Sequence, residues 1–240
     1  MKKTLIVIPT YFEKENIFKL IKKIQSLRLN TDIIIVDDTP ISLNISNNFL
    51  KKNRVQYINR KKKSGRGSAV IAGFKVAYKK NYDLFVEMDA DFSHNPKELK
   101  RNIKYFNKNS LDMLISSRYL KDSKIINWPI SRQIFSKMSN FLTRLILPVP
   151  VSDYTNGYRL YSKRSIKLIL NECGKIGDGF IVLSEILLKI YSKNYKIDEI
   201  KTIFINRKRG ESSVSFSLIV NSLFGLFKLY IISLKIKKNS

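Results

Sequence analysis

Two carboxylates, Asp89 and Asp91, stand two positions apart directly after a short apolar run at residues 84–86. In an extended chain, side chains at this spacing point to the same side. Two ionised carboxylates held together repel each other unless a cation lies between them. Mg²⁺ and Mn²⁺ accept carboxylate oxygens together with water and the oxygens of a substrate diphosphate. The triplet therefore predicts a metal site, although a cap for the following helix explains it equally well on its own.

Polar side chains follow three other apolar runs in the same manner. Thr10-Tyr11 and Glu13 follow residues 5–8, Asp37-Asp38 follow residues 33–36, and Ser117-Arg118 follow residues 113–115. Apolar runs that alternate with helical patterns predict an α/β fold, a mostly parallel sheet flanked by helices. The carboxyl ends of parallel strands share one edge, where ligands bind. We therefore expect these loops to form one site.

The helices that must cover this sheet have a clear pattern. Residues 13–27 carry apolar side chains at spacings of three and four, which predicts an amphipathic helix. We expect further helices at residues 67–78, 96–106, 130–147 and 180–191, and further strands at residues 55–58, 158–161 and 197–205. Gly65-Arg66-Gly67 predicts close backbone packing where a helix starts. Without a repeat or linker, we expect one domain over residues 1–213 and a C-terminal segment over residues 214–240.

A set of short motifs is distributed over residues 4–213: Val7-Ile8-Pro9-Thr10-Tyr11, Glu13, Glu15-Asn16-Ile17, Ile35-Val36-Asp37-Asp38, Gly65-Arg66-Gly67-Ser68-Ala69, Gly73-Phe74, Met88 to His94, Pro96, Ser117-Arg118-Tyr119, Trp128, Arg132, Asp153, Thr155 to Arg159, Arg207 and Gly210-Glu211-Ser212. In its composition and its order the whole set resembles the family-2 glycosyltransferases of the GT-A (Rossmann-like) fold, most closely the dolichol- or polyprenol-phosphate mannose synthases.

The resemblance assigns roles to individual positions. It implies that the nucleotide-sugar donor is bound by Pro9, Tyr11, Glu13, Val36, Asp38, Asp89, Ala90, Asp91 and Arg207. It implies that Mg²⁺ or Mn²⁺ is bound by Asp89, Asp91 and Ser93. It implies that Arg118, Arg132 and Ser136 hold the acceptor phosphate, and that Asp91, Arg118 and Arg132 are the catalytic residues.

The activity that the resemblance implies is inverting transfer of a sugar, with mannose from GDP-mannose expected, to a polyprenyl or dolichyl phosphate. Such an acceptor is already anionic and needs no general base, in keeping with a chain whose one histidine is His94. A different GT-A transferase, using a UDP-sugar and a saccharide or other hydroxyl acceptor, would need a base near Asp153 or Asp178. The residues after Asp37-Asp38, Thr39-Pro40-Ile41, depart from the family pattern and leave the donor base open.

The charge of the chain points to anionic partners. Lys and Arg number 45 against 19 Asp and Glu, which gives a net charge of +26. Nucleic acid, an anionic membrane face and phosphorylated ligands all fit such a charge, as does a diffuse solvated surface. We expect no nucleic-acid partner, because no known reading motif is present and the acidic loops would repel phosphate. The chain has one cysteine, Cys173, which excludes an internal disulfide and a Cys-rich zinc site. It also has one histidine, which excludes a metal site built from several histidines.

The pattern of the C-terminal segment indicates where in the cell the protein works. Residues 214–234 are almost wholly apolar apart from a narrow polar stripe that includes Asn221 and Lys228, which predicts an amphipathic helix in the membrane interface. A helix packed on the domain and a membrane span are the alternatives. Lys2 and Lys3 precede only a short apolar run closed by Pro9, so we expect no signal peptide. The expected location is cytoplasmic, peripheral on the cytoplasmic face of the membrane.

Overall fold

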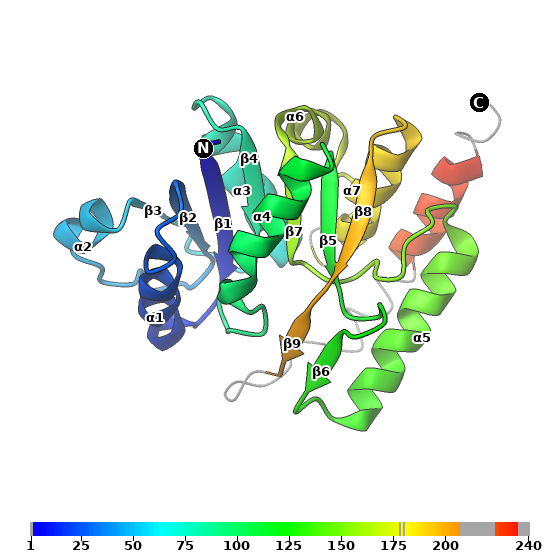
Figure 1. The fold of residues 1–240 in the computed structure, drawn as a ribbon, viewed down its shortest axis with the longest axis horizontal. Coiled ribbons are helices and arrows are strands. Elements are labelled where there is room, and N and C mark those ends of the chain that lie inside the picture. The colour runs from blue at the N-terminus through cyan, green and yellow to red at the C-terminus, as the bar shows by residue number, and fades with distance from the viewer. Residues whose placement is uncertain (1, 178, 180, 207–223, 235–240) are drawn as a thin grey trace.

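The computed structural model describes residues 2–177, 179, 181–206 and 224–234. In this part of the chain a seven-stranded sheet has the order β3-β2-β1-β4-β7-β5-β8 (Figure 1). Its strands are β1 (Thr4–Thr10), β2 (Thr31–Asp37), β3 (Val55–Asn59), β4 (Leu84–Glu87), β5 (Met113–Ser117), β7 (Arg159–Ser162) and β8 (Ile197–Lys201).

The sheet is mostly parallel, as predicted. Only β7, which lies between β4 and β5, pairs antiparallel with its neighbours. Because β1, β2, β4 and β5 run in one direction, the loops that follow them leave from the same edge. The predicted convergence of the four polar loops is therefore confirmed.

The helices agree with the sequence prediction except for two. They are α1 (Lys14–Gln25), α2 (Asn47–Lys52), α3 (Arg66–Tyr78), α4 (Leu99–Lys108, preceded by a 3₁₀ turn at Pro96–Glu98), α5 (Ile130–Ile146), α6 (Lys163–Glu172) and α7 (Ile181–Ser192). The short α2 buries no side chain and so left no periodic pattern in the sequence. Helix α6 follows β7 directly, with Ser162 as its N-cap, and was also not predicted.

The strand expected over residues 197–205 is divided. Its first part, β8, pairs with β5, whereas β9 (Ile203–Ile205) pairs with β6 (Lys124–Ile126) in a separate two-stranded sheet. Thr202 lies between the two parts, and its hydroxyl donates to Glu98 Oε2 at 2.5 Å. The prediction of one continuous strand is thus wrong, because the chain changes partner at Thr202.

Hydrophobic side chains fill both faces of the sheet. Alternate residues of β1 point to opposite sides: Leu5 and Val7 join a cluster with α3, α6 and α7, and Ile6 and Ile8 join a cluster with α1 and α4. Helix α3 lies close to the sheet at Gly73, where an added Cβ would come within 2.5 Å of Val7. At the start of α3, a Cβ added to Gly67 would come within 2.6 Å of Val182 of α7, so the close packing predicted for the Gly65-Arg66-Gly67 motif is confirmed there.

Residues 224–234 form the expected C-terminal helix, drawn in red in Figure 1. Its Leu226 and Leu229 belong to the main hydrophobic cluster, and Gly225 lies against Ile181 of α7. Among the described residues, no helix is both long and apolar enough to cross a membrane. The division at residue 213 falls outside the described residues and stays a prediction.

Candidate functional site

The Asp-x-Asp triplet lies in a turn after β4. The backbone N–H of Asp89 donates to His94 Nδ1 at 3.0 Å, and the backbone N–H of Ser93 donates to Asp91 Oδ1 at 3.0 Å. Between them Phe92 has a left-handed backbone with a φ of 62°. The extended backbone expected here is therefore wrong, and the two carboxylates have different partners.

Asp89 is bound by Arg66, whose side chain is 12% exposed and which belongs to the motif interpreted from the sequence as close backbone packing, with a direct substrate contact as the alternative. Arg66 Nε lies 2.8 Å from Asp89 Oδ1, and Arg66 Nη1 lies 3.7 Å from Glu87 Oε2. Burial alone would raise the pKa of Asp89, but the charge of Arg66 outweighs it and the pKa lies below its ordinary value. Asp89 thus stays a carboxylate inside the protein.

The guanidinium of Arg66 packs so closely on position 157 that only glycine fits there. Its Nη2 donates to the carbonyl oxygen of Gly157 at 3.1 Å, and a Cβ added to Gly157 would come 1.8 Å from Nη2. Beside it, Tyr161 donates from its hydroxyl to Glu87 Oε1 at 2.9 Å. The only sequence signal for this arrangement was an arginine between two glycines at the start of a helix.

His94 connects the turn to the rest of the site and is not placed as a metal ligand. Its Nε2 lies 2.9 Å from Asn156 Oδ1, and Asn156 Nδ2 donates to the carbonyl oxygen of Ser116. This assignment makes Nε2 the protonated nitrogen and Nδ1 the acceptor from Asp89, so both nitrogens are occupied. Burial lowers the pKa of His94 below its ordinary value, although the negative charge of Asp89 acts to raise it. A neutral ring stacked on Tyr158, with ring centroids 5.2 Å apart, supports the turn.

Residues expected at the donor base and ribose follow β1 and β2. Asp38 forms a bidentate ion pair with Arg60, at 2.6 and 2.8 Å, and also accepts the backbone N–H of Ser64 at 2.8 Å. Asp37 has a structural role, since it accepts hydrogen bonds from Thr39 and Tyr57. Arg60 was not predicted, and it fixes the loop between β3 and α3 at the edge of this site.

The β1 side of the donor site mixes buried and exposed groups. Pro9 pairs with Val36 in the β1–β2 register, and the Val36 side chain is wholly in the core, so a donor would meet its main chain. Tyr11 is 38% exposed at the rim. Glu13 directly precedes α1 and accepts from Asn16 Nδ2 at 2.6 Å. The buried Thr10 hydroxyl has no hydrogen-bond partner among the described residues, as expected where a ligand supplies one.

Arg118, at the end of β5, is fixed by a buried aspartate. Its Nε and Nη2 donate to the two oxygens of Asp153 at 2.8 and 2.7 Å, and Nη2 also donates to Thr155 Oγ1 at 2.7 Å. Burial works against the charge of Arg118, but Asp153 raises its pKa above the ordinary value. Asp153 is completely buried and lies in this pair, so it is not placed to act as a general base.

Helix α5 carries the other two residues predicted at the acceptor phosphate. Ser136 Oγ lies 2.7 Å from the hydroxyl of Tyr119, the residue after Arg118. Arg132, one turn earlier on α5, donates from Nη1 to Asn206 Oδ1 at 3.4 Å. Ser136 thus meets the residue next to Arg118, whereas Arg132 contacts the chain just after β9, and the shared role of the three residues at an acceptor phosphate stays a prediction. The sequence analysis also named Arg207, Asp178 and Gly210-Glu211-Ser212, which lie outside the described residues.

The oxygen ligands in the turn suit a divalent ion that is coordinated partly by the protein and partly by the substrate. In the described residues, no three His, Cys, Asp or Glu side chains gather as a closed metal site. Asp91 is partly exposed. Its carboxylate accepts one hydrogen bond from Ser93, and its remaining lone pairs can still bind a metal ion. Mg²⁺ takes one or two carboxylates and completes its shell with water and phosphate. Asp91 fits this role best, because Arg66 already occupies an oxygen of Asp89.

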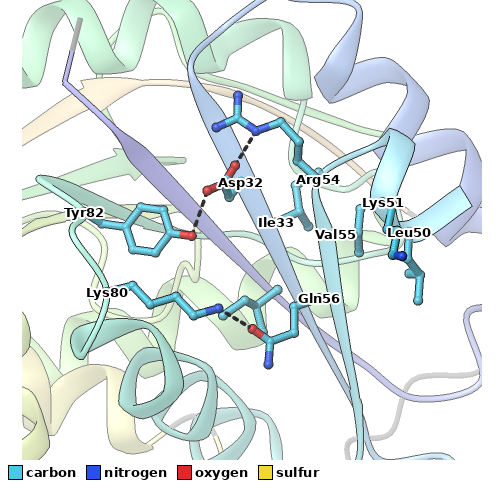
Figure 2. A pocket seen from close by; sticks show the side chains of 10 residues that line it. Asp32, Ile33, Leu50, Lys51, Arg54, Val55, Gln56, Lys80 and Tyr82 are labelled. Atoms are coloured by element: carbon cyan, nitrogen blue, oxygen red, sulfur yellow. Dashed lines mark hydrogen bonds and ion pairs between the residues drawn. The ribbon is translucent and has the colours of Figure 1, made fainter. Parts of the chain in front are cut away.

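A cavity of about 250 Å³ lies at the opposite edge of the sheet and is not part of this site (Figure 2). It opens where β2 and β3 begin, so it is separated from the polar loops by the length of the strands. Asp32 lines it and accepts the hydroxyl of Tyr82 at 2.8 Å. Arg54 Nε pairs with the same carboxylate at 2.5 Å.

The fold and the site together define a GT-A glycosyltransferase, an α/β enzyme with its Asp-x-Asp turn beside converging strand ends. The profile described as Glycosyl transferase family 2 matches residues 5–170, and the chain belongs to that family. Polyprenol monophosphomannose synthase from Mycolicibacterium smegmatis is 31% identical over 227 residues, 93% of this chain and 85% of that protein. Dolichol-phosphate mannosyltransferase from Pyrococcus furiosus is 35% identical over 233 residues, 95% of this chain and 63% of that protein.

Solved structures agree on the fold. Glucosyl-3-phosphoglycerate synthase from Mycobacterium tuberculosis, solved with Mn²⁺, UDP and glucosyl-3-phosphoglycerate, has a TM-score of 0.64 at 14% identity, covering 97% of this chain and 78% of that chain. The same enzyme solved with Mg²⁺ and UDP also has a TM-score of 0.64, covering 94% of this chain and 80% of that chain. The metals and nucleotides belong to those structures, and the likeness confirms the GT-A fold predicted from the sequence.

Proposed function

We propose that this glycosyltransferase moves mannose from GDP-mannose to a polyprenyl or dolichyl phosphate, with inversion at the anomeric carbon. The observation that supports the acceptor is a fixed arginine, Arg118, at the same edge of the sheet as the turn after β4. Arg118 is held by Asp153, and Ser136 of α5 contacts the neighbouring Tyr119, with Arg132 one turn earlier on the same helix. Relatives named as polyprenol-, dolichol- and undecaprenyl-phosphate mannosyltransferases support the same acceptor class.

The geometry suits a nucleophile that arrives already charged. A phosphate monoester is anionic at neutral pH, so its oxygen attacks the anomeric carbon without losing a proton to the enzyme. Arg118 and Arg132 would hold this phosphate by charge-assisted hydrogen bonds and fix its direction of attack. Among the groups described around Arg118, the one carboxylate in contact is Asp153, which is paired and buried.

The donor would lie along the edge formed by the β1, β2 and β4 loops. Tyr11, Glu13 and Asp38, with the main chain of Pro9 and Val36, would hold the nucleoside, and Ala90 lies in the turn at the diphosphate. Mg²⁺ or Mn²⁺, when bound at Asp91 with Asp89 and Ser93, would supply positive charge to the departing diphosphate. Arg207 is proposed to add a second positive charge there. This charge compensation is the largest expected catalytic contribution.

A transferase that uses a UDP-sugar and a hydroxyl acceptor is the alternative. It would require a general base, and the buried pairing of Asp153 with Arg118 argues against that residue. The experiment offers labelled GDP-mannose, UDP-glucose and UDP-GlcNAc, each with a short water-soluble polyprenyl phosphate or with free sugars. Transfer from GDP-mannose to the phosphate is expected. Transfer only to a hydroxyl acceptor, or only from a UDP-sugar, would overturn the corresponding half of the proposal.

The location proposed for the enzyme follows from its acceptor. A long polyprenyl chain lies in a bilayer, so the enzyme must work at a membrane surface, and we place it as a peripheral protein on the cytoplasmic face. The net charge of +26 suits an anionic headgroup layer.

A further inference from the structure

Strand β7 lies between the two strands that carry the predicted donor turn and the predicted acceptor arginine. Its first residue, Arg159, pairs with Glu87 of β4 on one side and with Ile115 of β5 on the other. Because β7 runs antiparallel to both neighbours, it begins at the edge of the sheet where β4 and β5 end. Segment 153–157, which leads into β7, therefore lies at the same edge as the turn after β4 and Arg118.

One part of segment 153–157 holds Arg118. Asp153 accepts the backbone N–H of Arg118 at 2.9 Å as well as two bonds from its guanidinium, and Thr155 Oγ1 accepts from Nη2. In the described part of the chain, every hydrogen bond donated by the Arg118 side chain ends on this segment. The direction of the guanidinium is thus set by the segment.

The other part of segment 153–157 holds Asp89 through two intermediate residues. Asn156 Oδ1 lies 2.9 Å from His94 Nε2, and His94 Nδ1 accepts the backbone N–H of Asp89. The carbonyl oxygen of Gly157 accepts from Arg66 Nη2, and Arg66 Nε donates to the carboxylate of Asp89. Both the backbone and the side chain of Asp89 are therefore connected to the segment that holds Arg118.

Arg159 fixes segment 153–157 to the sheet. Its side chain is fully buried, and its three guanidinium nitrogens all donate to main-chain carbonyl oxygens. Nε reaches Asn156 at 2.8 Å, Nη2 reaches Tyr154 at 2.7 Å, and Nη1 reaches Leu183 of α7 at 2.7 Å. A buried charge is unfavourable unless it is hydrogen-bonded, so these bonds hold the carbonyl groups firmly in place.

Glu199 of β8 fixes the start of the same segment. Its two carboxylate oxygens accept the backbone N–H groups of Ser152 at 2.7 Å and Asp153 at 3.0 Å. Glu199 pairs with Ile115 of β5, the residue that Arg159 faces from β7. Arg159 and Glu199 thus stand on either side of β5 and hold segment 153–157 near both of its ends.

We propose that segment 153–157 sets the distance between the Asp-x-Asp turn and Arg118, and that Arg159 and Glu199 are positioning residues for transfer. Transfer between two bound substrates needs the attacking oxygen aligned with the anomeric carbon, and a displacement of about 1 Å lowers the rate about 100-fold. One segment that holds both sides fixes this alignment before either substrate binds. The kinetic consequence rests on the proposed function, whereas the common support rests on the contacts alone.

The first test measures hydrogen exchange and needs no substrate. Glu199→Ala removes both acceptors at the start of the segment, yet in the described structure Glu199 forms no hydrogen bond with Arg118 or Asp89. Mass spectrometry of the peptides that contain the amides of Asp89 and Arg118 should show exchange about tenfold faster in both. Asp198→Ala, at the neighbouring position on β8, removes the acceptor of the Tyr105 hydroxyl and is the matched control that should change neither.

The second test separates kcat from KM with a short water-soluble polyprenyl phosphate. Arg159→Lys and Glu199→Ala leave the side chains that hold Asp89 and Arg118 intact. The KM for donor and for acceptor should therefore stay within about threefold of wild type, while kcat falls about 10- to 100-fold. Lysine keeps the charge of Arg159 but not the planar fork that reaches three carbonyl oxygens. Arg164→Lys on α6, 60% exposed, is the control.

Variants that break one part of the segment should give a different kinetic result. Thr155→Val removes a hydroxyl that accepts from Arg118, so it should raise the acceptor KM about three- to tenfold and leave the donor KM unchanged. Asn156→Ala removes the partner of His94 Nε2, so it should raise the Mg²⁺ concentration for half-maximal activity and leave the acceptor KM unchanged. The contrast distinguishes lost alignment from a lost contact.

The exchange data decide the common support, and the kinetics decide the positioning role. Faster exchange at both Asp89 and Arg118 in Glu199→Ala supports the common support even if the wild type transfers no mannose, a result that would remove only the proposed function. Faster exchange at one of them, at neither, or throughout the sheet overturns it. An Arg159→Lys protein with a lower melting temperature and wild-type kcat would show that Arg159 only stabilises the fold. If Arg159→Lys does not fold, Glu199→Ala decides both measurements.

Discussion

Arg66 Nε lies 2.8 Å from Asp89 Oδ1, so a side chain at the start of α3 fixes the first carboxylate of the turn after β4. We expect Arg66→Lys to fold but to lose about 100-fold in kcat/KM, because a point charge on a flexible stem does not hold Asp89 in place, and a shift of about 1 Å has that effect. The Mg²⁺ concentration for half-maximal activity should rise. Steady-state kinetics over a Mg²⁺ series measures both changes.

The control for this variant is Arg101→Lys on α4, whose side chain is 43% exposed and should leave both values unchanged. Arg66→Ala would leave the buried carboxylate of Glu87 and the partly exposed carboxylate of Asp89 without their cation and lower the free energy of unfolding by about 3–5 kcal/mol. An Arg66→Lys enzyme with unchanged activity and metal requirement would show that Arg66 serves packing alone.

Asp91→Asn should abolish transfer while the fold remains intact. The amide oxygen can still accept the backbone N–H of Ser93, so unfolding free energy should stay within about 0.5 kcal/mol of wild type. Loss of the negative charge removes the proposed metal ligand. Asp122→Asn, 63% exposed in the loop before β6, is the matched control and should be fully active. Wild-type activity should vanish in EDTA and return with Mg²⁺ or Mn²⁺; full activity in EDTA contradicts the metal assignment.

Arg132→Ala should weaken acceptor use far more than donor use. The loss of one charge-assisted hydrogen bond to phosphate corresponds to about a 10- to 100-fold rise in acceptor KM. Donor KM should change little, because Arg132 lies on α5 beside Ser136 and not at the donor loops. The assay uses a water-soluble acceptor, so the measured KM does not depend on membrane binding. Arg144→Ala on the same helix is the control. An equal rise in the KM for donor and for acceptor would contradict the assignment of Arg132 to the acceptor phosphate.

The sheet and the position of the site were predictable because each depended on local pattern. The wholly apolar runs at Leu5–Ile8 and Ile33–Val36 lie in a doubly covered sheet, and polar residues at strand ends share an edge for geometric reasons. The break at Thr202 was not predictable in this way. The alternating pattern continues through it, and only the pairing of β9 with β6, a contact distant in sequence, separates the two strands.

The partners of the site residues depended on contacts between distant segments. Arg66 and Gly157 are 91 positions apart, and the glycine is needed only because the guanidinium lies against it. His94 is near the turn in sequence, but its role depends on Asn156, 62 positions later. A sequence pattern gives the residue types, whereas the packing of α3 and β7 against β4 decides which charges meet.

The last prediction concerns acid stability at the edge away from the active site. Asp32 accepts from Tyr82, Lys3 and Arg54, as Figure 2 shows for Tyr82 and Arg54. Burial would raise its pKa, but these partners lower it below the ordinary value of about 3.9. A lowered folded-state pKa gives stability that is complete above the unfolded-state pKa and is lost as pH falls through the folded-state pKa. Asp32→Asn should therefore reduce unfolding free energy by about 1–3 kcal/mol at neutral pH, and the difference from wild type should shrink below pH ~3.9. Urea unfolding across a pH series measures this, with the exposed Asp122→Asn as control, and a difference that stays constant with pH would show that shape rather than charge makes Asp32 stabilising.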